Sequence, residues 1–190
     1  MTAPLILVTG PARSGKSDWA EQLAEQSGRS VVYVATSRVN TADAEWQHRL
    51  EQHRSRRPSH WQLKEVPLTL TETIQQAQPD QCWLIDSLGT WLANWIEADN
   101  ETWQRQHDGL LTALQGAPCP IILVAEETGW GVVPAYPMGR CFRDRLGNLT
   151  RAVGAIATST YLVTCGYALD LNKSAALVTG LHKQSSNRPL

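Results

Sequence analysis

The sequence predicts an α/β fold: a mostly parallel sheet with helices on both faces and a phosphate-binding loop after the first strand. Three observations carry this prediction. Apolar segments alternate with amphipathic helical segments along the chain. Most of the apolar segments are continuous, which is typical of parallel strands that are covered on both faces. The first of them leads directly into a glycine-containing loop at residues 10–17.

Six segments are expected to be strands. They lie at residues 4–9, 30–36, 61–66, 82–86, 121–125 and 160–164. The first contains Leu-Ile-Leu-Val and ends at Gly10, and the second contains Val-Val-Tyr-Val-Ala. Runs of β-branched and other apolar residues between turn residues favour strands. We expect a further short strand in the tail, at residues 175–178.

The intervening segments are expected to be helices. They lie at residues 17–26, 41–57, 68–78, 88–97, 101–115 and 138–157. The first places Trp19, Ala20 and Leu23 on one face and stops at Gly28, whereas the second is polar and stops at Pro58. The chain shows no internal repeat and no linker composition. We therefore expect a single nucleotide-binding domain over residues 1–190.

Charge and hydropathy limit the classes of function. The formal net charge of -1 lacks the basic excess of a general nucleic-acid-binding protein, so no nucleic-acid partner is expected. No segment approaches the roughly 20 apolar residues that a membrane span needs. The apolar run at residues 4–8 is too short for a signal sequence. The 4 cysteines are scattered without CxxC spacing, which favours buried, reduced thiols in a cytoplasmic protein.

The loop at residues 10–17 matches the P-loop pattern at every fixed position. Its residues are Gly10, Pro11, Ala12, Arg13, Ser14, Gly15, Lys16 and Ser17. Backbone N–H groups of such a loop converge on phosphate oxygens at the N-terminus of the following helix. Lys16 is expected to reach the β and γ phosphates, and the Ser17 hydroxyl is expected to bind Mg²⁺.

A P-loop enzyme also needs a carboxylate near the metal, at the end of a neighbouring strand. Asp86 follows the apolar run Cys-Trp-Leu-Ile and is the first candidate for this metal ligand. Glu126 and Glu127 end the next strand and are its rivals. The segment that begins at Asn172-Lys173 resembles a guanine-reading motif but lacks its Asp, so a GTPase switch is unsupported.

A cluster of basic residues occupies the predicted second helix. Arg49, His53, Arg56 and Arg57 are spaced to share one helical face. Such a face is ordinarily only solvated. In an enzyme that handles polyphosphate, however, the arginines suit phosphate oxygens, and the histidine suits nucleophilic attack on phosphorus. Both interpretations remain open on the residues alone.

Five segments of the chain together resemble one enzyme family. They are residues 9–17 (Thr-Gly-Pro-Ala-Arg-Ser-Gly-Lys-Ser), 33–37 (Tyr-Val-Ala-Thr-Ser), 53–58 (His-x-x-x-Arg-Pro) with Trp61, 127–134 (Glu-x-Gly-x-Gly-x-Val-Pro) and 142–144 (Phe-Arg-Asp). In this order they resemble the bifunctional adenosylcobinamide kinase/adenosylcobinamide-phosphate guanylyltransferases. The resemblance runs from about residue 5 to about residue 171. Its departures are Pro11, Glu126 and Thr150, where the family usually has Gly, Asn and Asn, and Gln52 before His53, where some members have a second histidine.

The resemblance implies a RecA-like P-loop fold, a homotrimer and two reactions. One phosphorylates adenosylcobinamide with ATP or GTP. The other transfers GMP from GTP to adenosylcobinamide phosphate, through a guanylylated histidine. Carried over, His53 is the nucleophile and Lys16 a catalytic P-loop residue. Further residues are implied to line the guanine nucleotide site: Thr36, Ser37, Arg54, Arg57, Glu65 and Asp86.

Three other functions remain as alternatives. A P-loop kinase for another small alcohol or nucleoside has the same loop and forms no histidine–GMP adduct. A nucleotide-sensing switch binds nucleotide without a phosphate acceptor. A nucleic-acid-dependent ATPase requires a basic surface, which the near-neutral composition does not favour.

Overall fold

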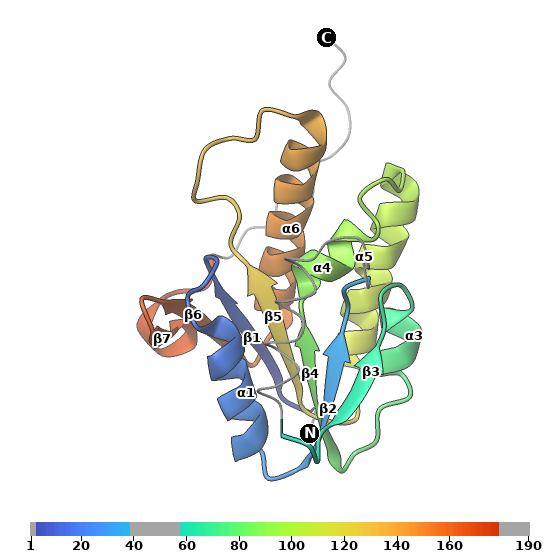
Figure 1. Ribbon diagram of the computed structural model, residues 1–190, viewed down its shortest axis with the longest axis vertical. Coiled ribbons are helices and arrows are strands. Elements are labelled where there is room, and N and C mark those ends of the chain that lie inside the picture. Colours follow the sequence, from blue (N-terminus) through green and yellow to red (C-terminus); the bar gives the residue numbers. More distant parts are fainter. Residues whose placement is uncertain (1–2, 39–57, 179–190) are drawn as a thin grey trace.

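The structure is a computed structural model that describes residues 3–38 and 58–178. A seven-stranded sheet forms its centre, in the order β3-β2-β4-β5-β1-β6-β7 (Figure 1). The strands are β1 (Leu5–Gly10), β2 (Ser30–Ala35), β3 (Gln62–Glu65), β4 (Gln81–Asp86), β5 (Ile121–Glu126), β6 (Ser159–Thr164) and β7 (Tyr167–Asp170). Every neighbouring pair is parallel except β6 with β7. The predicted α/β class with a mostly parallel sheet is confirmed.

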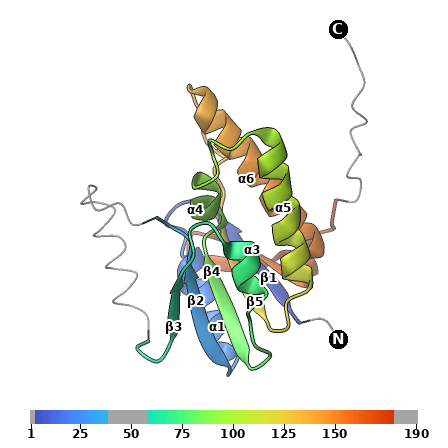
Figure 2. The same ribbon diagram turned by 90° about the vertical axis from the view of Figure 1, so that its right-hand side faces the viewer.

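Helices cover both faces of the sheet. They are α1 (Lys16–Gln26), α3 (Leu70–Ile74), α4 (Leu88–Ala93), α5 (Asn100–Gln115), α6 (Pro137–Ile156) and α7 (Leu171–Ser174). Helix α1 lies on one face, whereas α3, α5 and α6 lie on the other (Figure 2). No helix within residues 3–38 or 58–178 is long and apolar enough to cross a membrane.

Two hydrophobic cores explain why the strands are continuously apolar. Leu5 and Leu7 of β1 belong to the core beneath α4, α5 and α6, whereas Val8 belongs to the core beneath α1. The same division separates Trp83 from Leu84 in β4. Because successive side chains of a strand point to opposite faces, a sheet with two cores needs apolar residues at nearly every position.

Two predictions about secondary structure need correction at the C-terminal end of the sheet and around α4. Residues 175–178 do not form a strand, and the seventh strand is β7, at Tyr167–Asp170. Cys165 and Gly166, with φ of 52° and 77°, make a two-residue turn that folds β7 back against β6. Helix α4 ends at Ala93, well before the predicted residue 97, and the side chain of Asn94 binds the carbonyl of Thr36. The predicted helix at 41–57 lies outside the described residues.

The cysteines also depart from the prediction. Cys82 and Cys119 are buried as expected, but Cys141 is half-buried and Cys165 is exposed in the β6–β7 turn. Cys165 has a positive φ and lies in the turn before β7, the outermost strand of the sheet. No further strand in the described part of the chain packs beside this turn to bury its side chain. All 4 thiols are free.

Candidate nucleotide site

The predicted P-loop joins β1 to α1 at the edge of the sheet where the parallel strands end (Figure 1). Two of its residues have left-handed backbone conformations, Arg13 with φ 59° and Gly15 with φ 92°. A Cβ on Gly10 would lie 2.2 Å from the carbonyl oxygen of Val163 in β6, so the loop passes too close to the sheet for any side chain there. The loop therefore folds compactly over the end of β1, ahead of the α1 N-terminus.

Polar groups of the loop are poised for an anion. The Lys16 ammonium donates a hydrogen bond to the carbonyl of Pro11 at 3.2 Å, and the Lys16 side chain is buried. The hydroxyl of Ser14 is buried and has no hydrogen-bond partner among the described residues. A buried hydroxyl and a buried ammonium are costly unless a ligand satisfies them. Phosphate oxygens are acceptors of the kind that these two donors lack.

Asp86 lies at the same edge of the sheet. It ends β4, and β5 separates β4 from β1. The Asp86 carboxylate is half-buried and accepts a hydrogen bond of 2.9 Å from the hydroxyl of Tyr33, which orients it. Within the part of the chain that the structure describes, no three His, Cys, Asp or Glu side chains gather as a metal site. A hydroxyl from Ser17 and a carboxylate from Asp86 fit Mg²⁺, which commonly takes its remaining ligands from phosphates and water.

The two glutamates that rivalled Asp86 are both held by protein groups. Glu127 accepts a hydrogen bond of 2.8 Å from the Thr9 hydroxyl, and its own N–H donates to the carbonyl of Gly10 at 2.9 Å. Glu126 accepts a short hydrogen bond from the Ser87 hydroxyl and one of 3.0 Å from the N–H of Gly89. Both residues therefore brace the surroundings of the P-loop. Reasoning from the sequence considered them only as metal ligands and missed this role.

Burial sets the ionisation of Glu126. Desolvation raises the pKa of its carboxyl group above the ordinary value, while the hydrogen bond from Ser87 opposes this rise. The charge of Asp86 raises the pKa further, and the ammonium of Lys16 lowers it. Asp86 and Lys16 therefore both lie close enough to influence Glu126, although the three residues come from three different elements.

Thr36 reaches the same edge at the end of β2, but its side chain is fully buried. Its hydroxyl donates to the carbonyl of Ser87 at 2.6 Å and accepts from the N–H of Ser87 at 3.0 Å. Ser37 follows it and is half-buried, and Glu65 is exposed at the end of β3. The structure thus brings Thr36, Ser37, Glu65 and Asp86 to one edge, the one that carries the P-loop. Their contacts with a nucleotide stay predictions.

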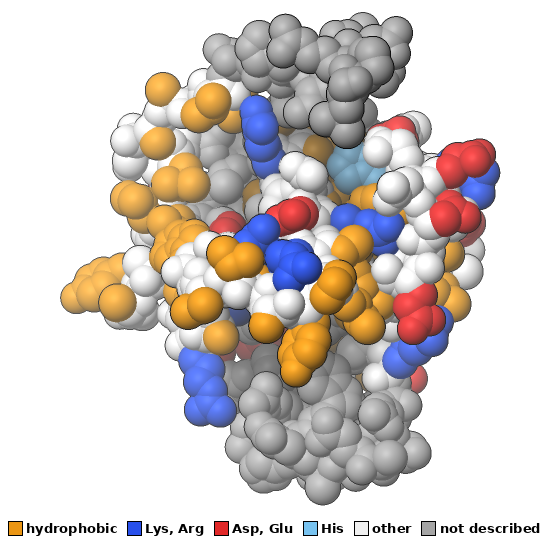
Figure 3. Space-filling view, turned by 90° about the horizontal axis from the view of Figure 1, so that it is seen from above, with side chains coloured by type: hydrophobic (Ala, Val, Ile, Leu, Met, Phe, Trp, Pro, Cys, Tyr) orange, Lys and Arg blue, Asp and Glu red, His pale blue; other side chains and the backbone are white. Residues whose placement is uncertain are grey.

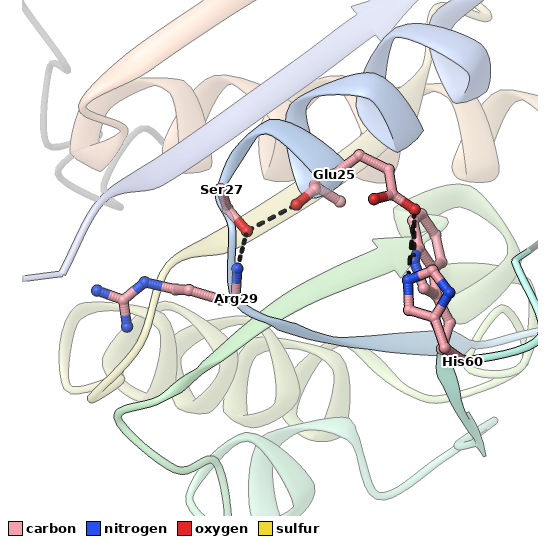
Figure 4. A network of polar contacts seen from close by, with 6 residues as sticks. Glu25, Ser27, Arg29 and His60 are labelled. Carbon is pink, nitrogen blue, oxygen red and sulfur yellow. Dashed lines mark hydrogen bonds and ion pairs between the residues drawn. The ribbon is translucent and has the colours of Figure 1, made fainter.

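The predicted basic cluster is not part of the described structure: His53, Arg54 and Arg57 lie outside the described residues. His60 is described, and it lies beside the C-terminal end of α1. Its Nε2 is 3.7 Å from Oε1 of Glu25, which also accepts a hydrogen bond from the Trp61 indole (Figure 4). Because α1 has 11 residues, about 16 Å long, His60 sits far from the P-loop at the other end of that helix.

A loop with exposed apolar side chains follows Glu127 and leads to α6. Its exposed members are Trp130, Val132, Val133 and Tyr136, and Met138 in the first turn of α6 is exposed as well. The loop stands above the edge of the sheet that carries the P-loop, and hydrophobic side chains are visible on the face seen from above (Figures 1 and 3). Its base is tied down, because the Arg140 guanidinium donates to the carbonyls of Pro134 and Ala135 at 2.9 and 2.7 Å.

Comparison with known proteins decides which P-loop family this is. Residues 6–171 match the family described as cobinamide kinase/cobinamide phosphate guanyltransferase. The chain belongs to this family. It is 38% identical over 167 residues to the bifunctional adenosylcobalamin biosynthesis protein CobP of Pseudomonas aeruginosa, covering 87% of this chain and 95% of the relative. It is 34% identical over 182 residues to the CobU proteins of Escherichia coli and Salmonella typhimurium, covering 88% of this chain and 99% of each.

Membership in the cobinamide kinase/cobinamide phosphate guanyltransferase family confirms the family and the two activities predicted from the sequence. The chain is a bifunctional enzyme that uses nucleotides and cobinamide substrates. Solved structures support the RecA-like P-loop fold. An ATPase of a type III secretion system has a TM-score of 0.55 at 10% identity, covering 92% of this chain and 59% of that one. A Pyrococcus horikoshii protein, PH0250, has a TM-score of 0.57 at 7% identity, covering 90% and 86%.

Proposed function

We propose that the enzyme first phosphorylates adenosylcobinamide with ATP or GTP. It then transfers GMP from GTP to adenosylcobinamide phosphate through a guanylylated His53. The products of the second reaction are adenosylcobinamide-GDP and pyrophosphate. The single observation that carries the proposal is the P-loop of a cobinamide kinase family member, with Lys16 and Ser14 buried and Asp86 at the same edge of the sheet.

The kinase reaction needs positioning and charge neutralisation rather than a covalent intermediate. The loop N–H groups and Lys16 hold the β and γ phosphates of the donor. Ser17 and Asp86 supply the protein ligands of Mg²⁺, which spreads the negative charge of the phosphates when bound. The acceptor hydroxyl of the cobinamide side chain attacks the γ phosphorus, and the nucleoside diphosphate leaves.

The guanylyl transfer is proposed as two displacements at the α phosphorus of GTP. A neutral ring nitrogen of His53 attacks the α phosphorus, the bond to the β-phosphate oxygen breaks, and pyrophosphate leaves. A phosphate oxygen of adenosylcobinamide phosphate then attacks the histidine–GMP adduct and frees His53. Histidine suits both halves because its neutral nitrogen is nucleophilic near pH 7 and leaves readily once the ring is protonated. Arg54, Arg57, Thr36, Ser37 and Glu65 are proposed to line the guanine nucleotide.

The apolar loop supports a bulky, largely apolar acceptor. Trp130 is 60% exposed and stands three residues after Glu127, which touches Thr9 and the P-loop residue Gly10. Three residues of extended chain span about 10 Å, so the loop can contact a corrinoid ring whose side chain enters the P-loop site. The homotrimer and the cytoplasmic location rest on the resemblance and composition alone.

Labelling with GTP that carries radioactive phosphorus at the α position tests the proposed relay. Wild-type protein is expected to retain acid-labile label, and His53→Ala is expected to retain none. His60→Ala is a matched control, because His60 lies at the far end of α1 and should leave the labelling unchanged. Equal labelling of wild type and His53→Ala would contradict the assignment of the nucleophile.

The alternative of a P-loop kinase without guanylyltransferase activity is not supported, because the family to which the chain belongs is described by both activities. Lys16→Ala tests the proposed role of the P-loop. It is expected to abolish phosphorylation of cobinamide, and unchanged kinase turnover would refute the loop assignment.

A further inference from the structure

A network of hydrogen bonds ties together the ends of β2, β4 and β5. We call Thr36, Ser87, Thr90 and Glu126 the strand-end network. The Ser87 N–H donates to the hydroxyls of Thr36 and Thr90 at 3.0 and 3.1 Å, and the Ser87 carbonyl accepts from both at 2.6 and 3.1 Å. Its hydroxyl donates to Glu126. Every polar group of Ser87 is therefore engaged.

The carboxylate of Glu126 fits this place closely. One oxygen accepts from the Ser87 hydroxyl and the other from the Gly89 N–H at 3.0 Å. An ionised carboxylate offers only acceptors, so it matches two converging donors. A Cβ on Gly89 would lie 2.2 Å from Oε2 of Glu126, so any larger residue at that position would displace the Glu126 carboxylate. The contact between β5 and the start of α4 is thus built around Glu126.

Ser87 is the residue directly after Asp86. Because the network holds both the N–H and the carbonyl of Ser87, it also fixes the backbone from which the Asp86 side chain projects. Tyr33 holds that side chain from the other direction, with its hydroxyl 2.9 Å from Oδ2. Groups that hold a metal-ligating side chain through hydrogen bonds commonly set its orientation and its affinity for the metal.

We infer that Glu126 is a positioning residue, which holds the β4–α4 turn through Ser87 and Gly89 and so directs the carboxylate of Asp86 toward the P-loop. The inference rests on the proposed role of Asp86 as a Mg²⁺ ligand. Its consequence is specific: loss of the Glu126 carboxylate weakens the Mg²⁺-dependent part of nucleotide binding, and does so beyond any general loss of stability.

The variant Glu126→Gln tests the inference with little change in volume. The amide keeps one acceptor but turns an N–H donor toward one of the two protein donors. GTP binding to the intact protein is measured by calorimetry at a series of Mg²⁺ concentrations. The Mg²⁺ concentration for half-maximal enhancement is expected to rise about tenfold or more. Amide hydrogen exchange at Ser87 and Gly89 is expected to quicken, and the KM for cobinamide to stay unchanged.

Asp99→Ala is the matched control. Asp99 accepts a hydrogen bond of 2.7 Å from the N–H of Thr102 and caps α5, so its loss also removes a carboxylate from the start of a helix. This control is expected to lower stability and to leave the Mg²⁺ dependence of GTP binding as in wild type. A tenfold shift in Glu126→Gln and none in Asp99→Ala supports the inference.

Three results overturn it. Glu126→Gln with wild-type Mg²⁺ dependence overturns the positioning role and leaves the proposed function standing. If GTP binding to the wild-type protein does not depend on Mg²⁺, the proposed role of Asp86 is overturned together with the inference. If Glu126→Gln does not fold, Thr90→Val replaces it as the test variant. This substitution removes the hydroxyl that bonds to the N–H and the carbonyl of Ser87. Wild-type Mg²⁺ dependence in folded Thr90→Val then overturns the inference, and a raised requirement supports it.

Discussion

Replacing Gly10 by alanine tests how closely the P-loop passes over the sheet. The added Cβ would lie 2.2 Å from the carbonyl oxygen of Val163 and 2.9 Å from the hydroxyl of Ser14, whereas ordinary contacts begin at 3.4 Å. The loop or β6 must therefore move by about 1 Å to relieve the contact with Val163. Neither movement is easy, because the obstructing atom belongs to the backbone of Val163, which is paired with β7 in the sheet.

We expect Gly10→Ala to lower the free energy of unfolding by about 3 kcal/mol, at the upper end of the cost of overpacking. In a protein of this size that corresponds to a fall in Tm of roughly 6–12 °C. GTP affinity should fall in addition, since Ser14 and the loop N–H groups are displaced. Thermal unfolding and calorimetric titration with GTP measure the two effects.

Gly28→Ala is the control for this substitution. Gly28 also has a left-handed conformation, with φ 65°, but nothing lies within 4 Å of the position of its Cβ. Its replacement should cost only about 1–2 kcal/mol, from the left-handed backbone, and leave GTP affinity unchanged. If Gly10→Ala is no less stable than Gly28→Ala and binds GTP as wild type does, the close packing of the loop against β6 is refuted.

Three further predictions concern the thiols and the apolar loop. Cys165 should react with an alkylating reagent in the folded protein, whereas buried Cys82 and Cys119 should react only on unfolding; mass mapping of labelled peptides would expose an error here. Burial raises the pKa of Cys119 from 9.0 to about 11, so the unfolded chain loses this proton first as pH rises. The free energy of unfolding should therefore fall between pH 9 and 11, and it should fall less steeply in Cys119→Ala than in wild type. Denaturant titrations at several pH values measure both slopes, and equal slopes would contradict the burial of this thiol. Trp130→Ala should raise the KM for cobinamide several-fold with little change in the KM for GTP, and steady-state kinetics that show the reverse would rule out the proposed corrinoid contact.

The sequence predicted the parallel sheet well because its signals are local and redundant. The strands of the two cores are apolar at nearly every position, as Leu5, Leu7 and Val8 illustrate, and the P-loop pattern marks the junction of β1 with α1. The hairpin of β6 and β7 was missed because its strand is short and exposed. Its signal was the turn at Cys165 and Gly166, which lacks the usual Asn-Gly or Asp-Gly.

The candidate site was predictable only in part. Lys16, Ser17 and Asp86 could be placed because a loop pattern and the end of an apolar strand fix their positions along the chain. The strand-end network joins Ser87 to Thr36 across 51 residues of sequence, and to Glu126 across 39 residues. No local pattern encodes such pairing, so the structural roles of Thr36 and Glu126 emerge only once β2, β4 and β5 lie together.

We propose that one enzyme transfers a phosphoryl group in one reaction and, through histidine, a guanylyl group in the next. Intact-protein mass spectrometry after incubation with GTP and Mg²⁺ tests it most directly. We expect a gain of one GMP, mapped to His53, that disappears when adenosylcobinamide phosphate is added and adenosylcobinamide-GDP appears. Formation of adenosylcobinamide-GDP by protein that never carries GMP, or by His53→Ala at the wild-type rate, would contradict it.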